Sequence, residues 1–144
     1  MQKTLILLKP DALERGLAGA ILARFEAAGM RIENCRYLRP TLQQLETHYA
    51  DLKGRNPRAF ERTTVTLQNK PFVAIILSGR NAILKVRALT GPTDPLKAPA
   101  GTIRGDFGND TIEKADAENR TTSNLIHAAD SEASVAHESA VWFG

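Results

Sequence analysis

Hydrophobic and polar positions follow several different periods along the chain, and each period predicts an element. Short apolar runs bounded by Pro or Gly are typical of strands that are buried on both faces. They predict strands over residues 4–8 and 72–77, and the second run is continuous enough for a central strand. Imperfect alternation predicts a further strand over 30–38, with one wet face or a bulge, and a short last strand covers 124–127.

Between these strands, apolar residues recur at helical spacing. Helices are predicted over 16–28 and 41–53, from 56 toward 67, from 81 to 91, and after the cap at 130–131. Thr41 and Gln44 fit a capping box, and Gly29 fits a left-handed helix end. Residues 93–124 are rich in Pro, Gly, Asp, Thr and Asn, so this segment is predicted to be mostly loop.

The order of these elements indicates the fold class. It runs strand, helix, strand, two helices, strand, helix, long loop, strand, helix, which is an α+β layout. Without the extra helix and the loop it reduces to the β-α-β-β-α-β pattern of a ferredoxin-like sandwich, a four-stranded antiparallel sheet covered by helices. The 144 residues show no internal repeat and fit one domain over 1–144.

Composition excludes several classes of protein. Hydrophobic residues make up 42% of the chain, but no apolar run approaches the ~20 residues that cross a bilayer, so no membrane is expected. The N-terminus enters a strand at once and lacks signal-peptide features, so secretion is not expected. Cys35 is the only cysteine, which rules out an internal disulfide and fits a reducing cytoplasm. A net charge of +3 favours anionic ligands such as nucleotides.

The histidines differ in their predicted settings. His127 ends a predicted strand just before a helix cap, where a side chain is held rigidly and remains accessible, as a nucleophile requires. Position alone favours the alternative, a histidine that is simply hydrogen-bonded at a strand end. His48 and His137 fall on helix surfaces beside polar residues, so both are predicted to be solvated.

Several cations suit a polyphosphate. Arg87, Thr93 and Arg104 flank the Gly- and Pro-rich segment, and two guanidinium groups with a hydroxyl form charge-assisted bonds to phosphate. The alternatives are that Arg87 interacts with its helix dipole and that Arg104 pairs with Asp106. Lys9 emerges at a strand end, where it contacts a substrate or simply reaches water.

Two aromatic residues have a similar ambiguity, since Tyr49 and Phe60 either pack in the core or expose a ring that stacks on a base. The chain has neither Gly-x-x-x-x-Gly-Lys-Ser/Thr nor Gly-x-Gly-x-x-Gly, so any phosphate site is built differently.

A series of motifs gives a sharper indication than any single residue. They are, in order, Lys9-Pro10-Asp11, Arg15-Gly16-Leu17, His48-Tyr49-Ala50-Asp51-Leu52, Gly101-Thr102-Ile103-Arg104-Gly105-Asp106-Phe107 and Asn124-Leu125-Ile126-His127. From about Lys3 to Phe143 the chain resembles the nucleoside diphosphate kinase family.

The resemblance implies a role for each matching residue. His127 would take the γ-phosphoryl group and pass it to a diphosphate in ping-pong fashion. Glu138 would hydrogen-bond the other ring nitrogen, with Tyr49 close by and Phe60 stacking on the base. The phosphates and ribose would be bound by Lys9, Arg87, Thr93, Arg104 and Asn124.

The resemblance also implies the partners of the chain. ATP and other nucleoside tri- and diphosphates would be the substrates, with one Mg²⁺ bridging their phosphates and no metal ligand from protein side chains. The family resemblance further implies a homo-oligomer, and the location expected is cytoplasmic.

The chain departs from the family pattern at several places, two of which bear on the predicted site. Ala128-Ala129 stands where the family usually has Gly-Ser, and residues at about 108–123 form an insertion. The insertion is interpreted as a solvated acidic loop, with a mobile flap as the alternative. One rival function is a regulatory module that binds nucleotide without efficient transfer. The other is a nucleic-acid binder, which is disfavoured because the strands lack paired aromatic residues.

Overall fold

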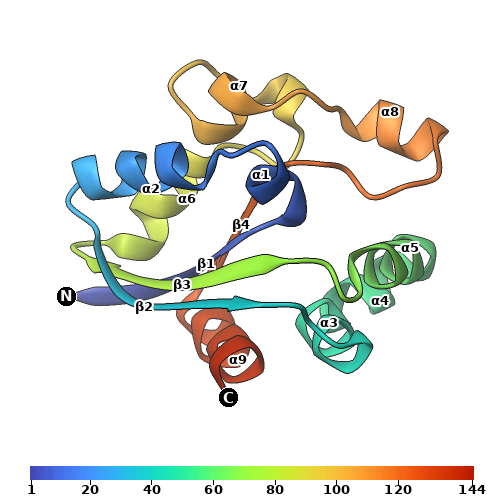
Figure 1. The fold of residues 1–144 in the computed structure, drawn as a ribbon, viewed down its shortest axis with the longest axis horizontal. Coiled ribbons are helices and arrows are strands. Elements are labelled where there is room, and N and C mark those ends of the chain that lie inside the picture. Colours follow the sequence, from blue (N-terminus) through green and yellow to red (C-terminus); the bar gives the residue numbers. More distant parts are fainter.

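A computed structural model describes residues 1–144, and its centre is a four-stranded antiparallel sheet in the order β2-β3-β1-β4 (Figure 1). The strands are β1 (Gln2–Leu8), β2 (Arg31–Leu38), β3 (Phe72–Gly79) and β4 (Ile126–Ala128). The predicted α+β class, the four strands and the central position of β3 are therefore confirmed. The register of β2 shifts between Ile32 and Asn34, as its imperfect alternation suggested.

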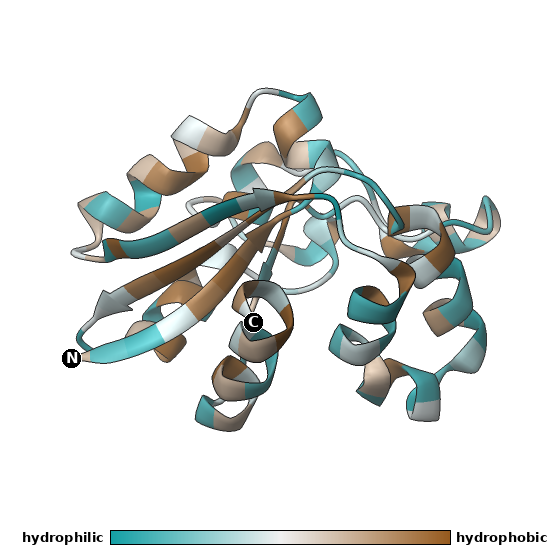
Figure 2. Cartoon of the chain, turned by 60° about the horizontal axis from the view of Figure 1, so that its bottom comes forward, coloured by the Kyte–Doolittle hydropathy of each residue, from teal (hydrophilic) through white to brown (hydrophobic).

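The two inner strands are buried on both faces. In β1, Ile6 and Leu8 belong to one hydrophobic cluster, and Leu5 and Leu7 belong to the other. All four side chains have 0% exposure, because successive residues of a strand point to opposite faces. Figure 2 shows this apolar character concentrated in the central strands.

Helices cover the sheet from both sides (Figure 1). One face packs against α2 (Ala18–Ala27) and α6 (Ala82–Thr90), and the other against α3 (Leu42–His48) and α9 (Glu132–Phe143). The helices α4 (Ala50–Arg55) and α5 (Pro57–Leu67) lie beyond one end of the sheet, beside α3. No helix is long and apolar enough to span a membrane.

Some helix boundaries differ from those predicted. The single helix expected over 41–53 is broken at Tyr49, although the capping box of Thr41 and Gln44 is present. The helix predicted from 81 begins one residue later, at Ala82 of α6, because Asn81 takes a left-handed conformation with φ 52°. The five-residue helix α1 (Pro10–Glu14) was not predicted, because one turn is too short to show a period.

The prediction for 93–124 missed three short helices, namely η1 (Pro95–Lys97), α7 (Ile103–Phe107) and α8 (Ile112–Ala117). Each begins at a side-chain cap. Asp94 accepts the amide of Leu96 at 3.1 Å, and Thr102 and Thr111 accept the amides three residues ahead at 2.9 and 3.0 Å. The polar residues that suggested loop therefore start helices, since such caps satisfy the free amides of a first turn.

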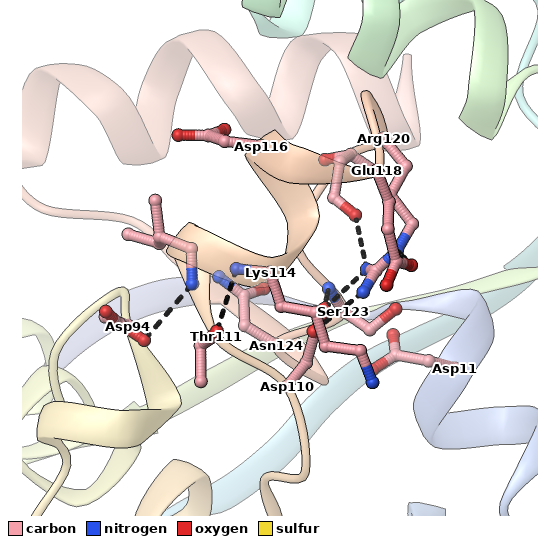
Figure 3. A network of polar contacts seen from close by, with 12 residues as sticks. Asp11, Asp94, Asp110, Thr111, Lys114, Asp116, Glu118, Arg120, Ser123 and Asn124 are labelled. Carbon is pink, nitrogen blue, oxygen red and sulfur yellow. Dashed lines mark hydrogen bonds and ion pairs between the residues drawn. The ribbon is translucent and has the colours of Figure 1, made fainter.

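The 108–123 segment is held by a partly buried ion pair between Asp110 and Arg120 (Figure 3). Asp110 is only 7% exposed and accepts both terminal nitrogens of Arg120, at 2.6 and 2.9 Å, together with the amide of Ser123 at 2.8 Å. Asp116 of α8 pairs with Arg62 of α5 at 3.2 Å. The interpretation of this segment as a solvated acidic loop is wrong for Asp110, because its charge is paired internally.

Candidate functional site

A cavity of about 370 Å³ opens where the ends of β1 and β4 meet the helices. The predicted site residues come together here from distant parts of the sequence. Every one of them except Phe60 lines the cavity, namely Lys9, Tyr49, Arg87, Thr93, Arg104, Asn124, His127 and Glu138.

His127 lies on β4, where it pairs with Leu7 of the buried strand β1. Its Nε2 lies 2.7 Å from Oε1 of Glu138, which projects from α9 and is only 8% exposed. An ionised carboxylate only accepts hydrogen bonds, so this contact places the ring proton on Nε2. The lone pair of Nδ1 is therefore left free for chemistry in a ring whose orientation is fixed.

The backbone just before His127 makes an unusually tight turn. The amide of Ile126 donates to the carbonyl of Asn124 at 2.8 Å, and Leu125 between them has φ 73°. A bulky residue in this region costs about 1–3 kcal/mol and persists only where its surroundings hold it. Leu125 is fully buried, and its amide donates to Asp11 at 3.0 Å, which together fix the turn.

Lys9 and Asn124 form a polar pair beneath this turn. The Nζ of Lys9 donates to Oδ1 of Asn124 at 2.9 Å, and Nδ2 of Asn124 donates to the carbonyl of Thr93 at 3.1 Å. Burial lowers the pKa of Lys9 to about 8; the charge of Asp11 raises this pKa by a smaller amount, and the charge of Arg104 lowers it further. An anion bound here would favour the charged ammonium.

Arg104 is anchored entirely by backbone carbonyls. Its guanidinium donates to Asn124 at 3.1 Å, to Gly91 at 3.0 Å and to Ile126. Burial, followed by the charge of Arg87, lowers the pKa of Arg104 to about 10, which keeps it cationic at neutral pH. The alternative of a pair between Arg104 and Asp106 is wrong, because Asp106 pairs with Arg24 at 2.7 Å.

The glycines around Arg104 explain its local geometry. Gly101 has φ 94°, and a Cβ on Gly105 would lie 2.0 Å from the carbonyl oxygen of Pro99. Only residues without a side chain allow the chain to approach itself this closely. The Gly-rich motif therefore folds into a compact turn that places the side chain of Arg104 at the cavity wall.

Arg87 keeps most of its donors available. It lies in the last turn of α6, is exposed, and donates one bond to the carbonyl of Ala128 at 3.0 Å. Thr93 is also exposed at the cavity wall. These two residues face the cavity as the predicted phosphate-binding role requires.

The prediction that His48 is solvated is wrong. It is 9% exposed, its Nδ1 accepts the indole N–H of Trp142 at 3.0 Å, and its ring centroid lies 4.6 Å from that of His127. Burial, more than the nearby His127, holds the pKa of His48 well below its usual value. The sequence carried a signal, since His48 follows the buried Leu45 at helical spacing. His137 is exposed, as predicted.

The three groups His48, His127 and Glu138 place potential metal ligands within 4.8 Å of one another. They do not fit a metal site. Because Nδ1 of His48 accepts from Trp142, its neutral ring carries the proton on Nε2 and has no second lone pair. Mg²⁺ moreover prefers oxygen ligands, and only one carboxylate is present.

Tyr49 and Phe60 have different settings. Tyr49 lines the cavity, and burial is the main cause that raises its pKa, so its hydroxyl stays a donor. Phe60 is 7% exposed and lies outside the cavity wall, with Nζ of Lys53 5.6 Å from its ring centroid. Its stacking on a base stays a prediction.

Comparisons with known proteins agree with this geometry. The model of one protein family, described as nucleoside diphosphate kinase, matches residues 2–144. The chain belongs to the nucleoside diphosphate kinase family. The resemblance suggested by the motifs is thereby confirmed.

Relatives within the nucleoside diphosphate kinase family are similar over nearly their full length. A nucleoside diphosphate kinase of Desulfitobacterium hafniense is 40% identical over 99% of this chain and 88% of its own. One from Picrophilus torridus is 41% identical over 99% and 95%. A Borrelia burgdorferi enzyme solved as a transition-state mimic with vanadate and ADP superposes with a TM-score of 0.95, at 32% identity, covering 99% of this chain and 87% of that one.

Proposed function

We propose that this chain works as a nucleoside diphosphate kinase in which Nδ1 of His127 carries the phosphoryl group between two nucleotides. The observation that carries the assignment of His127 is its contact with Glu138, which leaves Nδ1 unprotonated at the wall of a cationic cavity. Membership of the family indicates the reaction, and the contact with Glu138 indicates which atom is the nucleophile.

The reaction then has two symmetric halves. Nδ1 attacks the γ-phosphorus of a nucleoside triphosphate, an N–P bond forms, the bond to the β,γ-bridging oxygen breaks, and the diphosphate leaves. A β-phosphate oxygen of the acceptor diphosphate next attacks the phosphorus, and the N–P bond breaks. No proton has to leave the imidazole in either half, because Nε2 keeps its hydrogen on Glu138.

The surrounding residues position and stabilise the transferred group. Phosphoryl transfer needs mainly in-line placement and compensation of charge on the phosphate oxygens. Lys9, Arg87 and Arg104 supply positive charge, while the hydroxyl of Thr93 and the amide of Asn124 suit phosphate and ribose oxygens. One Mg²⁺ would enter on the phosphates of the nucleotide as part of the substrate, because the cluster of His48, His127 and Glu138 does not fit a metal site.

Steady-state kinetics test this function. With ATP as donor and GDP as acceptor, double-reciprocal plots should give parallel lines, and His127→Gln should abolish turnover. His137→Gln is a matched control, because His137 is an exposed histidine on α9 that does not line this cavity. Intersecting lines, or a His127→Gln variant with substantial activity, would contradict the proposal.

We also propose a homo-oligomer in which a second copy contacts β2. This strand pairs only with β3, and its exposed residues include Ile32 at 42% and Tyr37 at 62%. Unpaired strand edges are ready sites for association. Sedimentation equilibrium that finds only monomer at micromolar concentration would overturn this proposal.

Two further assignments have simpler support. We propose a cytoplasmic location because the exposed Cys35 suits a reducing compartment, and fractionation of cells would test it.

We also propose one domain over 1–144 with an insertion at about 108–123, since all four strands form a single sheet. Limited proteolysis that released two separately folded fragments would contradict the single domain.

A further inference from the structure

The segment that carries Arg104 is tied to a residue outside the cavity. Arg24 lies in the last turn of α2, is half-buried, and does not line the cavity. Its Nη1 donates to the carboxylate of Asp106 at 2.7 Å and to the carbonyl of Gly101 at 3.3 Å. These two partners lie on either side of Arg104 in the sequence. One side chain of α2 therefore contacts both ends of the segment that carries Arg104.

Asp106 connects the two ends of this segment to each other. Its Oδ1 accepts the amide of Gly101 at 2.9 Å, while its Oδ2 accepts from Arg24. The bond from Gly101, followed by the bond from Arg24, holds the pKa of Asp106 below its usual value, so the carboxylate is ionised at neutral pH. Hydrogen bonds between ionised partners are the strong ones, and they fix geometry more firmly than neutral ones.

Phe107 adds a further connection at the end of α7. The guanidinium carbon of Arg24 lies 4.8 Å from the centroid of the Phe107 ring, and the carbonyl of Phe107 accepts from Nη1 of Arg15 at 2.7 Å. The ring also packs against the hydrophobic cluster that includes Phe25 of α2. The backbone of α7 is thus held against α2, on the side away from the nucleotide cavity.

Arg104 is fixed at two places by different groups. The carbonyls of Asn124, Gly91 and Ile126 hold its guanidinium, and the contacts with Arg24 hold the backbone from which the side chain extends. A displacement of about 1 Å at a reacting site can lower the rate ~100-fold, even when its cause lies far from the chemistry. The placement of Arg104 therefore depends on a residue that no substrate reaches.

We propose that Arg24 is a positioning residue for phosphoryl transfer, which acts through Asp106 on the placement of Arg104. This inference rests on the proposed function, because it takes Arg104 as a group that stabilises the transferred phosphoryl. Loss of Arg24 leaves every cation of the cavity present and changes only where one of them lies. Because precise placement matters most in the transition state, kcat should fall more than the Kd of ADP rises.

Kinetics and calorimetry of the same variants test this role. Arg24→Gln should lower kcat by roughly fivefold or more, while the Kd of ADP stays within about twofold. Arg24→Lys should recover part of kcat, because a lysine keeps the charge that pairs with Asp106. Arg80→Gln is the matched control, since Arg80 is exposed and joins no ion pair, and its kcat should equal that of wild type.

Double variants test whether Arg24 acts through the proposed route. Residues that work as a unit give non-additive effects. Asp106→Asn should lower kcat about as much as Arg24→Gln, and the two together should lower it little further. In an Arg104→Gln background, Arg24→Gln should change the rate of phosphoryl transfer by less than about twofold, because the side chain that it positions is already gone.

The outcomes separate this inference from the proposed function. If wild type transfers phosphate and Arg24→Gln has the same kcat, the role of Arg24 is wrong while the kinase proposal stands. An equal loss in Arg80→Gln, an equal loss in ADP binding, or the full effect of Arg24→Gln in the Arg104→Gln background would also overturn it. If wild type transfers no phosphate at all, the proposed function itself is contradicted.

Discussion

At the scale of the residue, the site depends on how the environment prepares each side chain. Glu138 fixes the proton of His127 on Nε2, and backbone carbonyls hold the guanidinium of Arg104 in place. Burial lowers the pKa of Lys9. Matching the motifs identified these residues, but it did not show which contacts prepare them. It missed the burial of His48, because the only local signal was the helical spacing from Leu45, and the Trp142 that donates to His48 lies far away in the sequence.

The contact between Glu138 and His127 predicts a specific effect of Glu138→Gln. The amide can donate to Nε2 instead of accepting from it, which would move the ring proton to Nδ1 and block attack. Turnover should fall by roughly tenfold or more, since a wrong tautomer can cost as much as ~10⁴-fold. Stopped-flow measurement of the first phosphoryl transfer, monitored by Trp142 fluorescence, checks this; an unchanged rate would show that Glu138 does not set the tautomer.

The lowered pKa of Lys9 predicts that ADP binding depends on pH. Below about 8 the ammonium is charged in the free protein, and above about 8 it loses its proton. Bound phosphate favours the charged form, so binding above this pH takes up a proton. The Kd should therefore rise between pH 8 and 9.5, approaching tenfold per unit.

Lys9→Gln is the comparison for this effect. It should bind ADP more weakly at pH 7, with a much flatter dependence at higher pH. Calorimetry in two buffers of different ionisation enthalpy would reveal the proton uptake. An equal slope in wild type and in Lys9→Gln would assign the titration to another group.

At the scale of the element, the sequence predicted the framework well and the segment around the site less well. Strands with continuous apolar runs, such as β1 and β3, lie close to the predicted positions, as does the capped helix α5, and the capped start of α3 is also correct. The short elements α1, α7 and α8 were missed, because one or two turns are held by caps and tertiary contacts rather than by a repeating apolar stripe.

The pair of Asp110 and Arg120 predicts that the 108–123 segment contributes to stability. Asp110→Asn replaces the carboxylate that accepts two guanidinium bonds and the Ser123 amide, and should lower the free energy of unfolding by about 1–3 kcal/mol. Asp116→Asn is the control, because Asp116 is 58% exposed in its pair with Arg62, and should cost about 0–1 kcal/mol. Urea denaturation of both variants measures the difference.

The same pair gives this effect a pH dependence. Its hydrogen bonds with Arg120 hold the pKa of Asp110 below its usual value. Such a group contributes its full stability above the unfolded pKa of about 3.9 and loses it as the pH falls further. The gap between wild type and Asp110→Asn should therefore shrink below about pH 4; a gap that is constant down to pH 3 would contradict the ion pair.

At the scale of the whole molecule, the fold brings together residues that no local pattern connects. Lys9 and Asn124 are 115 positions apart, and His127 and Trp142 reach His48 from another part of the chain. Sequence periodicity cannot give these contacts. The ordered series of motifs could indicate them, because it reflects a family whose members share the whole arrangement.

The most direct test of the central claim is to incubate the protein with γ-labelled ATP and Mg²⁺ and then add unlabelled GDP, comparing wild type with His127→Ala. Wild type should acquire an acid-labile, base-stable label that GDP removes as labelled GTP, and His127→Ala should acquire none. A wild type that binds ATP without becoming labelled, or a His127→Ala variant that carries the label, would contradict phosphoryl transfer through His127.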